Sequence, residues 1–492
     1  MLAAYKFLTN TIAPVPRPTA SPKPSMSKYE WTAYWVIFIA GFGFALWISL
    51  ASSGYSLDDE ITHYLRSHQA WTHPERLLDN WTRPGRNFIH FFFAWMPLEA
   101  VRVATLLMAC GVGWIATKLA ASYNLKHLWL LPLFIWFEPW YLSLSGAVLT
   151  QTPFALFAIL GIYWLTRGHD FASGFCWGYL SLIRHEGFAF SLMFFVWFAV
   201  HGRWKGILGV IAPIAIYNLI SAIAIGAVPL AIFFEPKPTV IYGSGSLFHF
   251  VLPTLWFAGP MIVLLSLLGL PRLVRDWKFT WPLVIYPLYW LMHTIIFWRG
   301  MFASGGYFEF LMPMAPGFGI AALYGVQFLR TMAQDQPAIW RSACAGILLA
   351  VLLPPIVTTR PFVRDTMKSD LDTAMRWVAE NRSSAPIVLC ANIYVEYKNE
   401  LWRQPGYDTL HYTDPREQAM GTIIVWDYKY ADVTFFLKDE LEPAGSGWTR
   451  LTSFGKQAAL AKNPGEETVV IYERTGSCTL PKVERSDLLR QQ

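Results

Sequence analysis

The segment GYSLDDEITHYLRSHQAW, residues 54–71, places three acids in a row directly after an apolar stretch long enough to cross a membrane. Asp58, Asp59 and Glu60 would suit the macrodipole of a helix in its first turn, and Ser56 with Asp59 loosely matches a capping box. Ionisable groups at membrane depth are also costly and usually functional. The two interpretations can hold together, because a capped helix presents a carboxylate in a fixed position.

The composition of this 492-residue chain predicts a polytopic α-helical membrane protein. The chain is 54% hydrophobic and 15% charged, whereas soluble proteins carry about 25% charged residues. The net charge of +6 is modest, and much of the basic excess falls in short loops, where it orients helices. We therefore expect no nucleic-acid partner. The five cysteines form no Cys-x-x-Cys motif, which argues against a zinc module.

Apolar segments long enough to span a membrane recur along most of the chain. A spanning helix needs about 20 mostly apolar residues, and about 11 segments are candidates. Lys6, Arg17, Lys23 and Lys28 precede the first segment, so the N-terminus is expected to be cytoplasmic. Alternation then gives every cytoplasmic loop a basic residue and places the C-terminal tail outside. The segments lie near 31–50, 100–121, 127–144, 147–166, 171–183, 187–201, 206–228, 248–270, 281–298, 310–329 and 340–358.

The pattern predicts three regions. Residues 1–30 are rich in Pro and Ser and are expected to be a disordered cytoplasmic N-terminus. Residues 31–358 are expected to form the transmembrane domain, with a long charged first outer loop at about 51–99. Residues 360–492 are expected to form a small extracytoplasmic α/β domain.

The tail carries the signals of that α/β domain. Residues 369–383 have helical spacing, and 385–397, 421–431 and 467–476 are typical of buried strands. Cys390 and Cys478 also lie in the tail, where an oxidising compartment would allow a disulfide between them.

Three further segments, together with the acidic first loop, resemble the GT-C superfamily of membrane glycosyltransferases, which take a sugar from a polyprenyl-phosphate carrier. GAVLTQTPFALFAILGIYWL, residues 146–165, is similar to the fourth-helix pattern, with Gln151 where many members have Glu. LIRHEGFAF, residues 182–190, resembles the Arg-x-Glu-Gly stretch of dolichyl-phosphate-mannose mannosyltransferase-like members. GGYFEFLMPMAPGFGIAALYG, residues 305–325, resembles the late-helix Tyr…Pro-x-x-Pro segment, with Glu309 where Arg is common.

The resemblance implies a GT-C-like fold and a role for the acids. An Asp of the acidic pair would act as base or orienter on the acceptor hydroxyl, and Asp59 with Glu60 match that pair by position. Asp58 is the alternative base. A sugar on a lipid phosphate is an activated donor, so direct displacement with inversion needs one such carboxylate.

The donor phosphate needs cations. Arg83 and Arg86 lie in the acidic first outer loop, and Arg184 is expected at an outer helix end beside His185 and Glu186. Arginine suits bidentate phosphate recognition better than lysine does. The alternative is that these side chains contact lipid headgroups or extend to the interface.

A divalent cation, Mg²⁺ or Mn²⁺, is a further candidate. Asp59 and His63 are four residues apart and would share one face of a helix. Glu138 begins the second outer loop, where family members often carry another acid. With a donor phosphate, these residues could hold such an ion.

The function expected from these features is transfer of a hexose, with mannose favoured, from a polyprenyl-phosphate carrier to a lipid, glycan or protein hydroxyl. The reaction is expected on the outer face of a membrane, and the bacterial inner membrane is the expected location. A lipid-linked glycan ligase or polymerase is one alternative, although it would favour a large outer loop in mid-chain. A transporter or flippase is another, although it would favour an internal repeat and charges in mid-helix.

Overall fold

The computed structural model describes residues 26–56, 58–226, 228–229, 243–301, 304–333, 336–403, 417–429, 438–456 and 465–479. Most of the expected N-terminal disordered segment lies outside these residues. The chain divides into two compact units. The helical unit contains Arg66–Pro361 and the chain up to Ser52, and the sheet unit contains Ser53–Leu65 and Phe362–Ser486.

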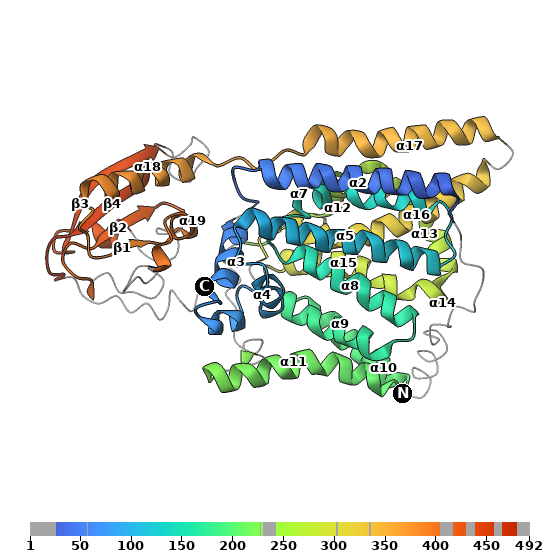
Figure 1. The fold of residues 1–492 in the computed structure, drawn as a ribbon, viewed down its shortest axis with the longest axis horizontal. Helices are drawn as coiled ribbons and strands as arrows, with labels where there is room; N and C mark the ends of the chain where they lie inside the picture. Colours follow the sequence, from blue (N-terminus) through green and yellow to red (C-terminus); the bar gives the residue numbers. More distant parts are fainter. Residues whose placement is uncertain are drawn as a thin grey trace. The chain divides into compact units, whose positions relative to one another are not determined.

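The helical unit is a bundle in which α2, α5 and α8 run side by side (Figure 1). Its α-helices are α2 (Lys28–Ala51), α4 (Pro84–Phe91), α5 (Leu98–Ser122), α6 (Leu131–Trp136), α7 (Pro139–Leu144), α8 (Gln151–Thr166), α9 (Asp170–Ile183), α10 (Gly187–Val200), α11 (Trp204–Ile225), α12 (Val251–Ala258), α13 (Pro260–Arg275), α14 (Trp277–Thr280), α15 (Ile285–Trp298), α16 (Ala315–Met332) and α17 (Pro337–Thr358). The described residues of this unit also form short 3₁₀ helices, namely η1 (Pro74–Leu78), η2 (Leu128–Leu130), η4 (Trp281–Val284) and η5 (Phe308–Met314).

Six helices among the described residues are long and apolar enough to cross a membrane, or seven if the bent pair α12 and α13 counts as one span. The expected count of 11 is therefore not confirmed. Helix length is the reason. The segment expected at 127–144 is divided into α6 and α7 at Pro139, and α9 and α10 have 14 residues each. At 1.5 Å per residue they reach only about 21 Å of the ~30 Å hydrocarbon core.

Glycines allow helices of the bundle to approach closely. A Cβ atom added to Gly174 or Gly178 of α9 would overlap backbone carbonyl groups of Gly206 and Val210 in α11. The same relation holds between Gly325 of α16 and the backbone of α13. Small residues at such contacts bring helix backbones together, which is how helices associate in lipid without a hydrophobic driving force.

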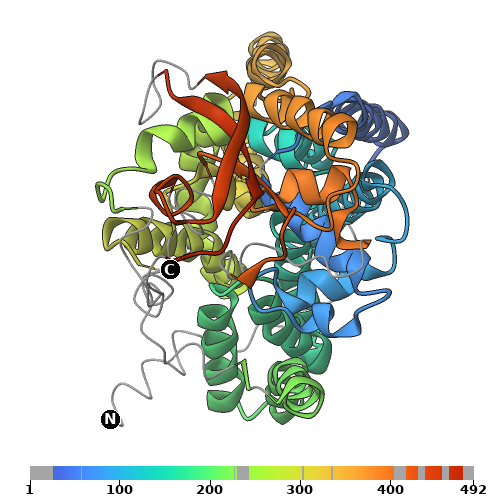
Figure 2. The same ribbon diagram turned by 90° about the vertical axis from the view of Figure 1, so that its left-hand side faces the viewer.

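The described part of the sheet unit contains a four-stranded sheet in the order β1-β2-β4-β3. They are β1 (Val388–Cys390), β2 (Ile423–Asp427), β3 (Trp448–Lys456) and β4 (Glu467–Arg474), accompanied by α18 (Thr366–Asn381), α19 (Ile393–Lys398), η6 (Leu401–Arg403) and α20 (Lys438–Leu441). β1 and β2 are parallel, and β4 is antiparallel to both β2 and β3. Figure 2 shows the long β3–β4 hairpin in red. β1, β2 and β4 lie in the segments whose sequences are typical of strands, but the second part of the first segment forms α19 instead. α18 covers most of the segment with helical spacing, and β3 was not predicted.

Apolar side chains form the core of the sheet unit. Leu389, Ile424, Trp426, Val470 and Tyr472 are buried in one cluster. α18 packs against β3 and β4. The five cysteines are all free, so the disulfide between Cys390 and Cys478 is not formed.

The short segment Ser53–Leu65 joins the sheet unit although it follows the first helix of the chain. The backbone N–H of Gly54 donates to the carbonyl of Phe362 over 2.9 Å. A Cβ atom on Gly54 would lie 2.5 Å from the backbone of Val363, so this approach requires glycine. The ring of Tyr55 packs on Tyr394 and Tyr397 of α19, with centroids 6.0 Å away in each case. These contacts incorporate the start of α3 (Asp58–Gln69) into the sheet unit.

Candidate functional site

The three acids at the start of α3 have three different environments. Asp58 is 8% exposed, Glu60 is fully buried, and Asp59 is exposed. Glu60 Oε2 accepts a hydrogen bond from the backbone N–H of Ser56 over 3.0 Å. Glu60 is therefore the acid that accepts the hydrogen bond from the backbone N–H just before the helix. The sequence assigned this role loosely to Asp59.

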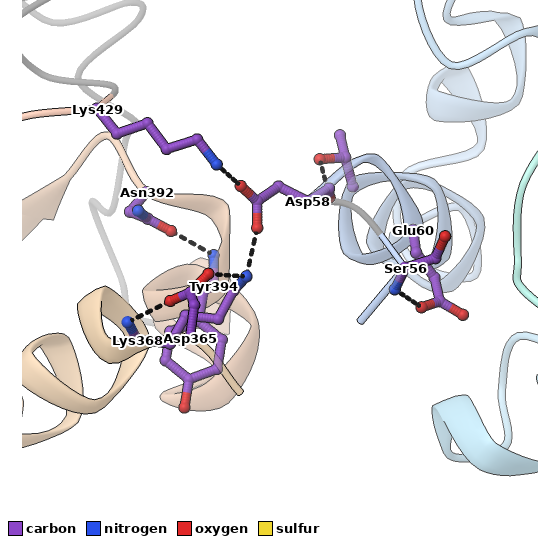
Figure 3. A network of polar contacts seen from close by, with 9 residues as sticks. Ser56, Asp58, Glu60, Asp365, Lys368, Asn392, Tyr394 and Lys429 are labelled. Carbon is purple, nitrogen blue, oxygen red and sulfur yellow. Dashed lines mark hydrogen bonds and ion pairs between the residues drawn. The ribbon is translucent and has the colours of Figure 1, made fainter. Parts of the chain in front are cut away.

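Asp58 lies between two lysines of the sheet unit (Figure 3). Lys368 Nζ is 2.8 Å from one carboxylate oxygen, and Lys429 Nζ donates to the other over 2.6 Å. The side chain of Lys368 is 7% exposed and that of Lys429 is 45% exposed. Burial alone would raise the pKa of Asp58, but the charges of Lys429 and Lys368 outweigh burial and lower this pKa to about 2.

The two lysines are held by their own local structure. Lys368 lies in the first turn of α18, where Asp365 caps the helix by accepting from the Lys368 backbone N–H over 2.8 Å. The Lys368 ammonium also contacts Asp365 over 3.0 Å. Lys429 follows β2, and its backbone N–H donates to Asp427 Oδ1 over 3.1 Å. A helix start and a strand end thus position the charges that hold Asp58.

Asp59 presents its carboxylate on the exposed side of the same helical turn. His63, one turn later, is buried at 6% exposure. The role of Asp59 as a base stays a prediction, and an exposed carboxylate beside a fixed helix start is compatible with it.

Arg86 forms a buried cationic site in the helical unit. It lies in the first turn of α4 and is fully buried. Its Nη1 donates to Ser67 Oγ over 3.1 Å and to Asn87 Oδ1 over 2.6 Å. Nε and Nη2 have no hydrogen-bond partner among the described residues. Buried donors without partners are rare, and a missing acceptor is one explanation for them.

The residues around Arg86 fix this turn. Arg83 precedes α4 with φ of 71°, which is uncommon for a residue other than glycine. Arg83 Nη1 donates to the carbonyl of Asn80 over 2.7 Å. Tyr179 of α9 donates its hydroxyl to the carbonyl of Gly85 over 2.8 Å. The strained entry to α4 and this contact to α9 hold the Arg86 turn in place.

Arg184 and Glu186 belong to a second buried cluster in the helical unit, which we call the Arg184 cluster: Thr150, Arg184, Glu186, Tyr289, His293, Glu309 and Phe310. Arg184 Nε and Nη2 donate to the two Glu186 oxygens over 3.2 and 2.9 Å. Arg184 Nη1 donates to Thr150 Oγ1 over 2.8 Å. His293 Nε2 of α15 is 3.3 Å from Glu186 Oε1. His185, between the two charged residues, is half-buried.

Glu138 is fully buried and caps α7 through a hydrogen bond from the backbone N–H of Tyr141. The described residues contain no group of three or more His, Cys, Asp or Glu placed to hold a metal ion. The Mg²⁺ or Mn²⁺ requirement therefore stays a prediction.

The sequence did not indicate Lys368, Lys429, Thr150, Tyr289 or His293. Thr150 lies in the segment 146–165 but was not singled out there, and each of the other four is a single polar residue with no motif around it. The alternating pattern around Lys429 only marks the end of a strand, and His293 lies in an apolar segment. A histidine within a membrane-length apolar segment is the one signal that could have been followed.

Comparisons with known proteins identify the fold. No protein-family model matches the sequence, and no curated protein matches it. Among solved structures, ArnT from Cupriavidus metallidurans matches with a TM-score of 0.58 and 12% identity over 92% of this chain and 100% of ArnT. The same protein bound to undecaprenyl phosphate matches with a TM-score of 0.56, at 11% identity over 93% of this chain and 100% of that one.

Two other structures match over most of this chain. The arabinofuranosyltransferase AftD from Mycobacteria has a TM-score of 0.53 and 13% identity over 93% of this chain and 41% of AftD. The oligosaccharyltransferase of Archaeoglobus fulgidus has a TM-score of 0.51 and 11% identity over 90% of this chain and 76% of that enzyme. At these identities the similarity establishes the fold. The chain therefore shares its fold with ArnT, AftD and the archaeal oligosaccharyltransferase, and its long apolar helices are those of an integral membrane protein.

Proposed function

We propose that the chain is a membrane glycosyltransferase that transfers a hexose, with mannose favoured, from a polyprenyl-phosphate carrier to an acceptor hydroxyl. The GT-C fold supports this class of reaction, and the ligand of the ArnT structure supports the class of carrier, because that ligand is undecaprenyl phosphate. The acceptor would be a lipid, a glycan or a protein.

The observation that carries the proposal is the fully buried Arg86, whose Nε and Nη2 have no hydrogen-bond partner among the described residues. The charge of Asp79 acts on Arg86 but leaves these two donors unsatisfied, and buried unsatisfied donors are costly. A phosphate would supply the acceptors that these donors lack, in the bidentate geometry that arginine favours. Arg83, three residues earlier, is the second cation assigned to the phosphate.

The reaction assigned to the chain is a single displacement. The acceptor oxygen forms a bond to the anomeric carbon while the bond from that carbon to the phosphate oxygen breaks, which inverts the configuration. Asp59 takes the proton of the acceptor hydroxyl. The polyprenyl phosphate leaves with the bonding electron pair, and the arginines stabilise its negative charge. No step is routed through a metal.

The membrane orientation is part of the proposal. Basic residues before α2 and in alternate loops would keep the N-terminus in the cytoplasm. The acids of α3 and the sheet unit would then face the extracytoplasmic side of a bacterial inner membrane, where lipid-carried sugars can be used without a soluble nucleotide-sugar donor.

Binding of polyprenyl phosphate by protein reconstituted in nanodiscs tests the proposal. Arg86→Gln should bind radiolabelled polyprenyl phosphate at least about tenfold more weakly than wild type, because a charge-assisted pair is lost. Arg86→Lys should fall in between, since lysine keeps the charge but not the fork geometry. Lys205→Gln, which removes an exposed charge in the helical unit, is the control and should bind normally.

The result that overturns the proposal is wild-type affinity in a folded Arg86→Gln variant, together with no consumption of any polyprenyl-phosphate sugar by wild type. If wild type instead moves the labelled lipid between leaflets without cleaving it, the transporter alternative replaces the transferase.

A further inference from the structure

The Arg184 cluster brings ionisable groups from distant parts of the sequence together inside the helical unit. Thr150 precedes α8, Arg184 and Glu186 flank the junction of α9 and α10, His293 lies in α15, and Glu309 lies in η5. All of these side chains are buried or nearly so. Ionisable groups buried in a membrane-spanning bundle are expensive and usually serve a function.

The charges of the Arg184 cluster disfavour an anionic ligand. The guanidinium of Arg184 is already matched by both oxygens of Glu186. Glu309, which is 6% exposed, adds a second carboxylate whose charge also acts on Arg184. Two carboxylates thus face the single guanidinium of Arg184, so the Arg184 cluster does not offer the excess positive charge that favours a phosphate. The phosphate role expected for Arg184 is thus better filled by Arg86.

Two polar groups of the Arg184 cluster lack partners. His293 and Tyr289 are each 2% exposed, and neither His293 Nδ1 nor the Tyr289 hydroxyl has a hydrogen-bond partner among the described residues. The two rings are in edge contact, with centroids 4.6 Å apart. An unsatisfied buried donor or acceptor costs about 1–3 kcal/mol. A ligand that both donates and accepts hydrogen bonds would remove that cost.

Aromatic rings supply an apolar wall beside these groups. The ring of Phe310 lies 4.7 Å from the Arg184 guanidinium and is stacked with His293 at a centroid distance of 5.5 Å. Tyr289 also packs on Phe154 at 5.2 Å. A few convergent polar groups within an aromatic lining are typical of small-molecule sites.

The Arg86 turn and the Arg184 cluster border the same turn of α9. Gly85, next to Arg86, is so close to Leu182 that an added Cβ atom would lie 2.8 Å from the Leu182 Cβ atom. Arg184 follows Leu182 by two residues and caps the same helix. The Arg86 turn offers a positive charge, and the Arg184 cluster beside it offers hydrogen-bonding groups without excess positive charge. A ligand with a phosphate and an adjoining uncharged polar group would match these two neighbouring sites.

From these observations we propose that the Arg184 cluster is the subsite for the sugar ring of the donor and that it selects an uncharged, hydroxyl-bearing ring. Sugar hydroxyls can donate to Glu186 and accept from Arg184, His293 or Tyr289. A carboxyl-bearing sugar would be excluded by Glu186 and Glu309. This inference rests on the proposed function, because it names the group recognised next to the lipid phosphate.

Comparing two lipids separates this inference from the proposed function. Reconstituted protein is titrated with a polyprenyl-phosphate hexose and with unglycosylated polyprenyl phosphate. Tyr289→Phe keeps the ring and removes only the hydroxyl, so it should weaken binding of the sugar-bearing lipid about 3–10-fold and leave the plain lipid unchanged. Tyr286→Phe is the matched control, because its hydroxyl is also buried without a described partner one turn earlier in α15. It should alter neither affinity.

A second variant, His293→Asn, should have the same selective effect. Wild type should also bind the neutral hexose lipid more tightly than a uronic-acid lipid. The inference is overturned if Tyr289→Phe and His293→Asn bind both lipids as wild type does, or if they weaken both equally. If wild type binds the plain lipid but gains nothing from the sugar, the sugar subsite is rejected while the phosphate site stands. If wild type binds neither lipid, both proposals fall.

Discussion

Asp58 and Lys429 are 371 positions apart in the chain, and their side chains meet over 2.6 Å. Through this contact, and the one from Lys368, the sheet unit holds the first turn of the helix that follows the first membrane span. The acid next in sequence, Asp59, is exposed. Neighbouring carboxylates thus differ in environment, and under the proposed function the exposed one is assigned the role of base.

Asp58→Asn should destabilise the protein. It removes the charge shared by Lys429 and the buried Lys368, and loss of one partner of a buried pair typically costs about 3–5 kcal/mol. Lys368 retains its contact with Asp365, so the lower end of that range is expected. A lower midpoint of thermal unfolding would show the loss, whereas the exposed Asp59→Asn should stay within about 0.5 kcal/mol of wild type. Equal midpoints for the two variants would contradict the assignment.

The lysines should differ in importance. Lys368 is 7% exposed and Lys429 is 45% exposed, so water screens the second contact more than the first. Lys368→Met should therefore lower the unfolding midpoint more than Lys429→Met. The reverse order in a thermal unfolding experiment would mean that exposure does not set the strength of these contacts.

The Asp58 contact should fail in acid. The pKa of Asp58 is lowered to about 2 in the folded chain, against about 3.9 in an unfolded one. A carboxyl with a lowered pKa stabilises the fold above its unfolded value, and this contribution is lost as the pH falls from about 4 to 2. The amount is about 2.6 kcal/mol. The free energy of unfolding of wild type and of Asp58→Asn is measured between pH 5 and 2. The difference between the two proteins should shrink as the pH falls, and a difference independent of pH would contradict the ion pairs.

Gly178→Ala should disrupt the bundle, because its Cβ atom would overlap the backbone carbonyl of Val210 in α11. Overpacking of this kind costs about 1–3 kcal/mol. Gly346→Ala in α17 is the control, since an added Cβ atom meets nothing within 4 Å there. Thermal unfolding in detergent should show a lower midpoint for the first variant and an unchanged or higher one for the second, because alanine favours helix more than glycine does. A stable Gly178→Ala variant would show that the two helices can separate at no cost.

Much of the fold could be predicted from the sequence because apolar runs are a local signal. Each expected membrane segment contains helix, and β1, β2 and β4 of the tail were predicted from the same kind of signal, whereas β3 was not. The number of spans could not be obtained from hydrophobicity, since Pro139 divides one apolar run and α9 and α10 are short helices. Apolar composition indicates that a segment is buried in lipid or protein, but it does not give the length of the helix.

The candidate sites were predictable only where their residues are neighbours in sequence. Arg184 and Glu186 stand two apart and could be recognised as a unit, as could the three acids. The lysines that hold Asp58 come from α18 and the end of β2, and His293 comes from α15. These contacts join residues that are far apart in the sequence, so no local sequence pattern could predict them.

Transfer from a radiolabelled polyprenyl-phosphate mannose to added acceptors, measured with reconstituted protein, tests the central claim most directly. Wild type should release the label from the lipid. A folded Asp59→Asn variant should be slower by about 10²–10⁴-fold, the usual contribution of a general base. Turnover of Asp59→Asn at the wild-type rate would contradict the assigned base, and the absence of any turnover by wild type across a panel of lipid-linked hexoses would contradict the transferase itself.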